Sequence, residues 1–326
     1  MALRAIVVTP AARGSRSGNR TTALRWAALL RRCGLSVAVR ERWNGEPADL
    51  LVAVHAVKSR DSVLAHHAAH PLAKRIVLLA GTDVYPTFAP DADTLRALEA
   101  ADAIVTLQPM AQLALPKALQ HKVHTIVQSA TAVAGAIRAE RGLTVCVLAH
   151  LRAVKDPLLP FAALAQVPKD LDVTVTLAGK PLDAELGRQA AAWSTQDQRA
   201  FYVGELDRVA ARRLVAESRL LVVPSTAEGG ANVISEAIAA GTPIAATRVP
   251  GNVGLLGADW PALFAAGDAA GLGKLLTALA TDRARYDALV RATLALQEMV
   301  SPATELARWR HVLGVLGVLG VLGRRG

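Results

Sequence analysis

The sequence predicts an α/β protein built from two Rossmann-like domains whose parallel sheets face a central cleft. Short runs rich in Val, Ile and Leu alternate with longer segments whose apolar residues repeat at helical spacing. The short runs are apolar on both faces, as is typical of parallel strands covered by helices on both sides. The alternation restarts near residue 140, so we expect a second domain to follow the first.

The first half is predicted to contain six strands and three helices. The expected strands cover residues 4–10, 35–40, 49–56, 75–81, 103–108 and 122–128, and the expected helices cover 21–34, 62–70 and 91–101. Gly34 is a typical helix stop, and Asp91 or Asp93 can cap the third helix. A loop rich in Gly, Ser and Arg (11–20) joins the first strand to the first helix.

The second half repeats this pattern. Strands are expected at 144–151, 172–179, 200–206, 219–225 and 242–247, with helices at 158–166, 183–193, 209–218 and 231–241. We therefore predict an N-terminal domain over 1–138 and a C-terminal domain over 139–300. Crevices at the carboxyl ends of parallel strands are the usual ligand sites in such domains.

The last stretch, 301–326, differs in composition. Ser301 and Pro302 are suited to the start of a helix over 301–313, which we expect to return to the N-terminal domain. Four copies of Val-Leu-Gly follow at 312–323. Because Gly at every third residue opposes helix continuation, this segment is predicted to be a low-complexity tail.

Composition excludes several classes of protein. Of 326 residues, 52% are hydrophobic and 20% charged, which is too apolar for a disordered chain. Apolar runs stay shorter than a membrane span, and two cysteines cannot staple a fold of this size. His66 and His70 could share a helix face, but no third ligand is placed, so no metal or other cofactor is expected. We expect a soluble cytoplasmic protein that does not bind membranes.

The net charge of +10 raises the question of nucleic-acid binding. The charge is uneven: residues 1–140 carry 17 Lys and Arg against 10 Asp and Glu, and residues 141–326 carry 20 against 17. Seven arginines and no acidic residue fall before residue 33. Twelve aromatic residues do not interleave with these cations as in a single-strand binder. The pattern favours a small anionic ligand in the first half over nucleic acid.

An acidic motif lies in the second half, in the segment STAEGGANVISEA (225–237). Glu228 falls in a Gly-rich loop after a strand, and Glu236 lies two turns into the next helix. Free backbone N–H groups at such a helix start bind anions, and Gly229 and Gly230 allow close approach of a ligand. A carboxylate beside them could meet sugar hydroxyls or a ribose. The alternative is a capping Glu and a solvated helical Glu.

A basic pair lies in AHLRAVKDP (149–157), directly after the first strand of the second half. Arg152 and Lys155 could hold a diphosphate and stabilise the negative charge that develops as it leaves. Ordinary loop cations are the alternative. His150 precedes the pair and could be structural or functional.

Together these motifs resemble the retaining GT-B glycosyltransferases of family 4, which carry an Arg/Lys pair and a Glu-x7-Glu motif. The resemblance covers about residues 1–300. It implies a UDP-sugar donor, with Arg152 and Lys155 on the diphosphate, Glu228 in catalysis and Glu236 on the ribose. The spacing between Arg152 and Lys155 is three, where the family usually has five. The remaining implied donor contacts are Gly18, Asn19, Gly179, Val203, Gly204, Gly229, Gly230, Ala231 and Asn232.

The first half, together with HLRAVKDP and EGGANVISEA in the second, resembles the SenB-type selenosugar synthases of selenoneine biosynthesis. The resemblance is carried by the SGNR loop (17–20) and by Gly81, Thr82, Asp83 and Tyr85. It implies that selenophosphate accepts the sugar of a UDP-sugar, notably UDP-N-acetylglucosamine, with release of UDP and then phosphate. The implied acceptor contacts are Arg13, Arg16, Arg20, His55, Lys58, Thr82 and Asp83.

The residues independently favour a small anionic acceptor, because cations cluster after two strands of the first half. A solvated basic face is the alternative, and Asp83 could equally cap a loop. Glu228 could bind sugar hydroxyls, steady positive charge or act as a nucleophile. Alternative functions are a GT-B transferase with another small acceptor, an epimerase or hydrolase of the same fold, and a basic nucleic-acid-binding protein. The sequence does not indicate an oligomeric state.

Overall fold

The computed structural model describes residues 3–15, 17–81, 83–85 and 89–319. The chain divides into two compact units, one formed by residues 1–127 with 303–326 and the other by 128–302. The sequence pattern places these divisions at residues 138 and 300. Each unit is built around one parallel six-stranded sheet.

The first unit has the strand order β2-β1-β3-β4-β5-β6. The strands are β1 (Arg4–Val8), β2 (Ser36–Arg40), β3 (Leu50–Val54), β4 (Lys74–Leu79), β5 (Ala103–Thr106) and β6 (Val123–Thr125). The helices are α1 (Gly18–Arg32), α2 (Ala56–Ala69), α3 (Ala92–Ala100), α4 (Lys117–Gln120) and α12 (Pro302–Val315), with a 3-10 turn η1 (Pro109–Ala114).

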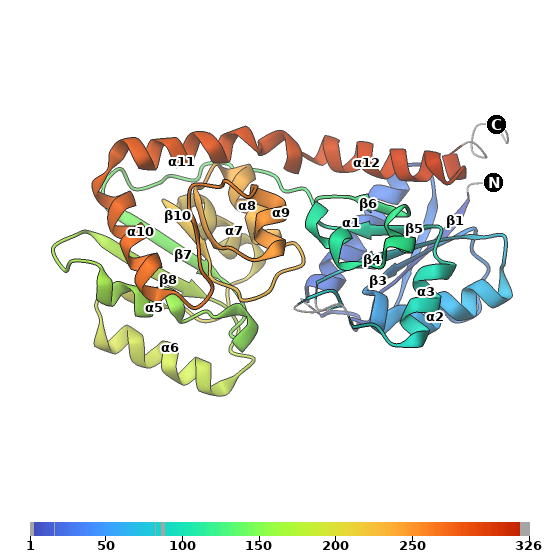
Figure 1. Cartoon of the computed structure of the whole chain (residues 1–326), viewed down its shortest axis with the longest axis horizontal. Helices are drawn as coiled ribbons and strands as arrows, with labels where there is room; N and C mark the ends of the chain where they lie inside the picture. Colours follow the sequence, from blue (N-terminus) through green and yellow to red (C-terminus); the bar gives the residue numbers. More distant parts are fainter. Residues whose placement is uncertain (1–2, 16, 82, 86–88, 320–326) are drawn as a thin grey trace. The chain divides into compact units, whose positions relative to one another are not determined.

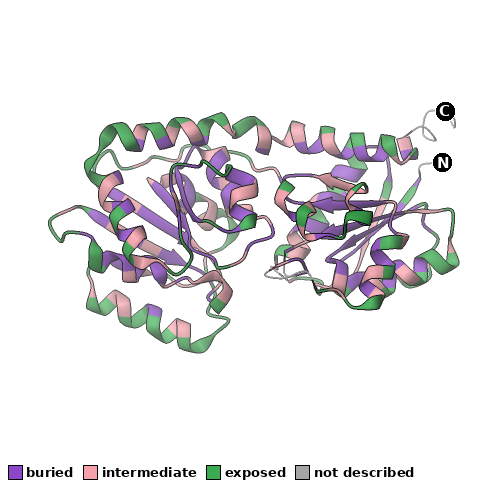
Figure 2. Ribbon diagram, viewed as in Figure 1, coloured by how far each residue is buried: buried purple, intermediate pink, exposed green. Residues whose placement is uncertain are grey.

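Alternating strand residues supply two cores in this unit. Ala5 and Val7 of β1 face the core shared with α1 and α12, whereas Ile6 and Val8 face the core shared with α2 and α3. Strands buried on both faces explain the continuous apolar runs in the sequence. Figure 2 shows the buried strands with exposed residues on the outer faces of the helices.

The second unit has the strand order β12-β11-β10-β7-β8-β9. The strands are β7 (Leu143–Leu148), β8 (Val173–Ala178), β9 (Ala200–Tyr202), β10 (Leu220–Val223), β11 (Ile244–Thr247) and β12 (Leu263–Phe264). The helices are α5 (Leu159–Ala163), α6 (Ala184–Gln196), α7 (Arg208–Glu217), α8 (Asn232–Ala240), α9 (Pro250–Leu256), α10 (Ala269–Thr281) and α11 (Arg283–Ala295). Short 3-10 turns are η2 (Ala153–Lys155), η3 (Leu164–Gln166) and η4 (Gln297–Val300). Figure 1 shows the sheet between α5 and α10 on one side and α7 and α8 on the other.

The prediction of a low-complexity tail is wrong for residues 312–319. Helix α12 continues through Gly314 to Val315, and Val312, Leu313 and Val318 are buried in the core that contains α1. The Trp309 ring contacts Trp26 of α1 edge-on, with 4.7 Å between ring centroids. Burial of these apolar side chains outweighs the helix penalty of about 1 kcal/mol for each glycine.

Arg138 anchors the irregular segment that precedes β7. Its guanidinium donates to the carbonyls of Ala216 (2.9 Å), Ala240 (2.5 Å) and Gly241 (2.9 Å), and to the Thr242 hydroxyl (2.8 Å). These acceptors lie at the ends of α7 and α8, where helix carbonyls lack partners and the helix dipole is negative. Burial lowers the pKa of Arg138.

We predict that Arg138→Leu destabilises the protein by about 3 kcal/mol, because several buried carbonyls lose a charged donor. Urea unfolding followed by circular dichroism measures the change in free energy of unfolding. Arg141→Leu is the matched control, since Arg141 is exposed three residues away. Equal stabilities of the two variants would contradict the capping role.

Candidate functional site

The candidate donor site lies where the strand order of the second unit reverses. β7 is the first strand of this unit and β10 the fourth, and they pair side by side at the centre of the sheet. The loops that follow them leave the sheet in opposite directions, which creates a crevice at their carboxyl ends. The first loop carries Arg152 and Lys155, and the second carries Glu228.

Lys155 and Glu228 are in direct contact across this crevice. Lys155 Nζ lies 2.6 Å from Glu228 Oε1, and the Ser225 hydroxyl donates to the same oxygen at 2.6 Å. The Glu228 side chain is 7% exposed and that of Lys155 is 22% exposed. Two loops 73 residues apart in sequence are thus joined by a shielded ion pair, where electrostatic interactions are stronger than in water.

A turn of unusual geometry positions Lys155. The 3-10 turn η2 covers Ala153–Lys155 and ends at Asp156, whose φ of 42° is left-handed. The backbone of Thr226 donates to the Val154 carbonyl at 2.9 Å, which ties the turn to the Glu228 loop. Arg152 precedes the turn and is exposed.

The start of α8 completes the same crevice with backbone donors. The N-cap residue Ala231 gives no side-chain hydrogen bond to the helix, and no acidic residue occupies the first turn. Gly230 has a φ of 151°, a conformation that suits glycine. Asn232 Oδ1 is buried without a hydrogen-bond partner in the described chain. A helix start with free N–H groups is suited to binding an anion. Glu236 is half-buried in the second turn.

Further cations surround the loop after β7. The Lys180 backbone donates to His150 Nδ1 at 3.3 Å, which leaves Nε2 of the neutral ring as a donor. Burial lowers the pKa of His150, Glu205 opposes this, and Arg152, Lys180 and Lys155 lower it further. His150 is therefore neutral near pH 7.

Gly179 allows the loop after β8 to pack closely against the loop after β7, and Gly204 after β9 has a left-handed φ of 72°. A Cβ on Gly179 would lie 1.8 Å from the Ala149 carbonyl oxygen, so no larger residue fits. Gly179 N donates to the Gly204 carbonyl at 2.8 Å, and Tyr202 donates its hydroxyl to the Gly179 carbonyl at 3.0 Å. Val203, between Tyr202 and Gly204 in the sequence, is 47% exposed. Its apolar side chain is therefore available to pack against a planar ring of a ligand.

In the first unit, the order reverses between β1 and β3, and predicted acceptor residues follow both strands. His55 follows β3 with a φ of 75°, and its Nδ1 accepts from the Lys58 backbone at 3.4 Å. This capping starts α2 at Ala56, six residues before the predicted start at 62. Non-glycine residues in such strained conformations cluster at functional sites. Burial lowers the pKa of His55, and Asp83 opposes that effect.

The contacts of Asp83 are those of a residue that caps a loop, which is one of its two predicted roles. Its carboxylate accepts from the backbones of Ala56 (2.8 Å), Ala80 (3.1 Å) and Gly81 (2.7 Å). His55 Nδ1 lies 3.6 Å away, and the Asp83 side chain is fully buried. Asp83 therefore positions His55 and the loop after β4 from within.

The loop between β1 and α1 carries the arginines predicted to bind the acceptor. Arg13 is exposed, and its backbone donates to Glu41 Oε1 at 2.9 Å. Ser17 caps α1 by accepting from the Arg20 backbone at 3.4 Å, so the helix begins at Gly18 and Asn19 and not at residue 21. The predicted acceptor residues Arg16 and Thr82 lie outside the described residues.

Three residues in or beside the candidate donor site have no distinctive pattern in the sequence: Ser225, Lys180 and Gly251. Ser225 is a direct partner of Glu228, but a serine after a strand has no distinctive pattern. Gly251 in α9 packs against Glu228, since a Cβ there would lie 1.9 Å from the Glu228 carbonyl oxygen. Tertiary contacts alone reveal this role.

Two further features are absent from the described residues. They contain no group of three or more His, Cys, Asp or Glu side chains placed to hold a metal ion. No described helix is both long and apolar enough to cross a membrane.

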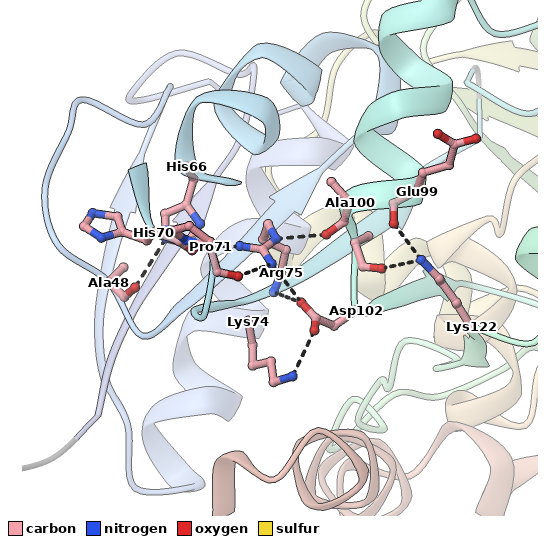
Figure 3. Close-up of polar contacts among 11 residues, drawn as sticks. Ala48, His66, His70, Pro71, Lys74, Arg75, Glu99, Ala100, Asp102 and Lys122 are labelled. Atoms are coloured by element: carbon pink, nitrogen blue, oxygen red, sulfur yellow. Dashed lines mark hydrogen bonds and ion pairs between the residues drawn. The ribbon is translucent and has the colours of Figure 1, made fainter. Parts of the chain in front are cut away.

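Two hollows of about 680 and 630 Å³ lie in the first unit, away from the strand ends that carry the site. Figure 3 shows the polar contacts near them, where Arg75 donates to the carbonyls of Ala100 and His70 and lies beside Asp102. His66 Nε2 lies 3.3 Å from the Ala48 carbonyl in the same view. These contacts fix the start of β4 and the end of α2.

His66 makes stability depend on pH. Burial lowers its pKa from 6.5 to about 4, so the folded protein keeps the ring neutral while the unfolded chain protonates it. Stability is therefore fully present above pH 6.5 and falls as pH drops toward 4, by up to about 3 kcal/mol. Urea unfolding at several pH values measures this loss. His66→Gln should reduce this dependence and leave the contributions of His55 and His150, whose pKa values burial also lowers. His67→Gln, which changes an exposed neighbour, should preserve the full dependence.

Comparison with solved structures places the fold in the GT-B class, as the sequence predicted. HepE from Anabaena, in complex with UDP and glucose, is 16% identical, with 96% of this chain and 100% of HepE covered and a TM-score of 0.74. Sucrose-phosphate synthase from Thermosynechococcus elongatus is also 16% identical, with 96% and 99% covered and a TM-score of 0.77. A glycosyltransferase from Rickettsia africae is 13% identical, with 98% of each chain covered and a TM-score of 0.76.

Residues 141–282 match the family model described as glycosyl transferases group 1. The matched segment includes Arg152, Lys155, Glu228 and Glu236, so it contains the candidate donor site. A search of curated protein sequences gives no significant match.

Proposed function

We propose that the protein is a UDP-sugar-dependent glycosyltransferase that transfers N-acetylglucosamine to the selenium of selenophosphate. The main support for a UDP-sugar donor is the cluster of Lys155, Glu228 and Ser225 beside the uncapped start of α8. This cluster lies at the switch point of the sheet, within the segment that matches glycosyl transferases group 1. HepE, similar in fold, is described in complex with UDP-glucose.

The donor diphosphate would bind between Arg152, Lys155 and the N–H groups from Gly230 to Asn232. The N–H groups are held by the helix before the reaction, so they stabilise the charge that builds on the departing UDP with little reorganisation, and the two cations add positive charge beside them. Val203 and Gly204 would lie beside the base, and Glu236 would accept from the ribose hydroxyls. In this arrangement Lys155 turns from Glu228 toward the phosphates, which frees the Glu228 carboxylate to face the sugar.

The reaction breaks the bond between the anomeric carbon and the UDP oxygen, and UDP leaves with the electron pair. Selenium of selenophosphate supplies the pair for the new carbon–selenium bond. Water then cleaves the selenium–phosphorus bond, which releases phosphate and a selenosugar. Selenophosphate is already a soft anion, so positioning and leaving-group stabilisation do most of the catalysis. In this mechanism, side-chain cations and not a metal ion bind the diphosphate and neutralise its charge.

The acceptor would bind in the first unit near Arg13, Arg20, His55 and Lys58. Arg13 and Lys58 are exposed, and their charges can attract a small polyanion. Buried Asp83 holds the His55 backbone turn in place and does not reach solvent. The selenium acceptor rests on the resemblance to SenB-type enzymes and on this cationic loop cluster.

The test measures UDP binding by calorimetry and then product formation. The full chain is incubated with UDP-N-acetylglucosamine and selenophosphate, thiophosphate or no acceptor, and products are identified by mass spectrometry. A selenium-containing sugar with equimolar UDP supports the proposal. UDP release without an acceptor indicates a hydrolase or epimerase, and release that requires a hydroxyl acceptor indicates another GT-B transferase. Absence of UDP binding contradicts the donor assignment.

A further inference from the structure

A line of buried hydrogen bonds connects helix α9 with the Glu228 carboxylate. Asn252 Nδ2 donates to the Thr247 hydroxyl at 3.0 Å and to the Thr247 carbonyl at 3.1 Å. Thr247, the last residue of β11, donates its hydroxyl to the Ser225 carbonyl at 2.5 Å. Ser225 donates its own hydroxyl to Glu228 Oε1 at 2.6 Å. We refer to Asn252, Thr247 and Ser225 as the support relay.

The support relay is fully enclosed in the second unit. Asn252 and Thr247 are 0% exposed, and Ser225 is 1% exposed. Burial of three polar side chains costs free energy that apolar residues of similar size would not incur. Here the hydrogen bonds end on the Glu228 carboxylate, so they can orient that side chain and act through it without touching substrate.

The geometry indicates how the support relay could act during catalysis. Within the described part of the chain, the Glu228 carboxylate contacts Lys155 Nζ and the Ser225 hydroxyl. If the donor diphosphate draws Lys155 away, Ser225 remains as the hydrogen-bond donor to that carboxylate. The orientation of Ser225 in turn depends on Thr247, which binds the Ser225 carbonyl, and on Asn252, which fixes the Thr247 hydroxyl.

We propose that Ser225, Thr247 and Asn252 are positioning residues that hold the Glu228 carboxylate toward the transferred sugar once Lys155 has engaged the diphosphate. This inference rests on the proposed glycosyltransferase function. It assigns to the second unit a set of residues that act on kcat through Glu228. The affinity for UDP depends on other groups, namely the cations and the α8 backbone.

The test compares Thr247→Val, which removes the hydroxyl but keeps the shape, with Thr247→Ser, which keeps the hydroxyl. The matched control is Thr293→Val, because Thr293 is also 0% exposed and donates its hydroxyl to a backbone carbonyl, that of Leu289 in α11. The readouts are the Kd for UDP by calorimetry, and kcat and KM for UDP release from UDP-N-acetylglucosamine with thiophosphate or selenophosphate.

We expect Thr247→Val to lower kcat about tenfold or more while the Kd for UDP and KM stay within about twofold. Thr247→Ser should recover at least half of the wild-type kcat, and Thr293→Val should keep it. A kcat for Thr247→Val within twofold of wild type overturns the proposal, as does a Thr247→Ser variant that is equally impaired. If Thr247→Val does not fold, Ser225→Ala is judged by the same kcat and Kd criteria. If the wild-type protein neither binds UDP nor consumes the donor, the proposed function itself is wrong. That result is distinct from any effect of a variant.

Discussion

Replacing Lys155 by alanine is expected to slow UDP release from a UDP-sugar by about 100-fold or more, as loss of a group that stabilises a developing oxyanion does in other enzymes. In the proposed mechanism, Lys155 supplies positive charge to the departing diphosphate. In the free enzyme its removal also leaves the shielded Glu228 carboxylate with Ser225 but without a cationic partner. The variant therefore loses charge stabilisation during the reaction, and its unpaired carboxylate also repels the donor diphosphate as it binds.

Steady-state kinetics with saturating UDP-N-acetylglucosamine measure this loss, and urea unfolding separates it from instability. Lys169→Ala is the matched control, because Lys169 is an exposed lysine of the same unit outside the strand-end loops. Arg152→Ala should show a loss of similar size if the exposed guanidinium shares the diphosphate. Near-normal turnover of both Lys155→Ala and Arg152→Ala would contradict the diphosphate assignment.

The spacing of this basic pair illustrates what the sequence could and could not predict. The type and order of the residues predicted a candidate donor site, and the structure brings its two loops together, because cations after the first strand and a glutamate after the fourth converge at a switch point. The contact between Lys155 and Glu228 depends on the tight turn η2 and on the left-handed Asp156, which composition does not reveal. A spacing of three residues thus still brings one cation onto the acidic motif.

His55 and Asp83 illustrate a second limit. The apolar pattern of 49–56 predicts a strand, but the strand ends at Val54 because Asp83, 27 residues away, binds the backbone of Ala56. A carboxylate that satisfies three backbone donors from two loops is a tertiary feature, so local patterns predict neither the early start of α2 nor the strained φ of His55. Similarly, Val-Leu-Gly repeats form part of α12 only because Trp26 and its neighbours provide a core for them.

The helical glycine at 251 is predicted to be as sensitive as the charged residues of the site. Gly251 lies in α9, and a Cβ there would lie 1.9 Å from the Glu228 carbonyl oxygen and 2.7 Å from its Cβ. Real Cβ atoms do not approach backbone so closely, so Gly251→Ala must displace either α9 or the Glu228 loop. Displacement of α9 would also move Asn252 and break the support relay.

We expect Gly251→Ala to lower kcat by about 100-fold, because a shift of about 1 Å in a catalytic group costs that much. Overpacking should also reduce the free energy of unfolding by about 1–3 kcal/mol. Kinetics and urea unfolding on the same preparation measure the two effects. Gly314→Ala is the matched control, since Gly314 is also helical but a Cβ there meets nothing within 4 Å. That variant should keep full activity and equal or higher stability, because alanine favours helix. If Gly251→Ala matched it in both measurements, the loop would tolerate the added methyl, and close packing against Glu228 could not be what fixes the carboxylate.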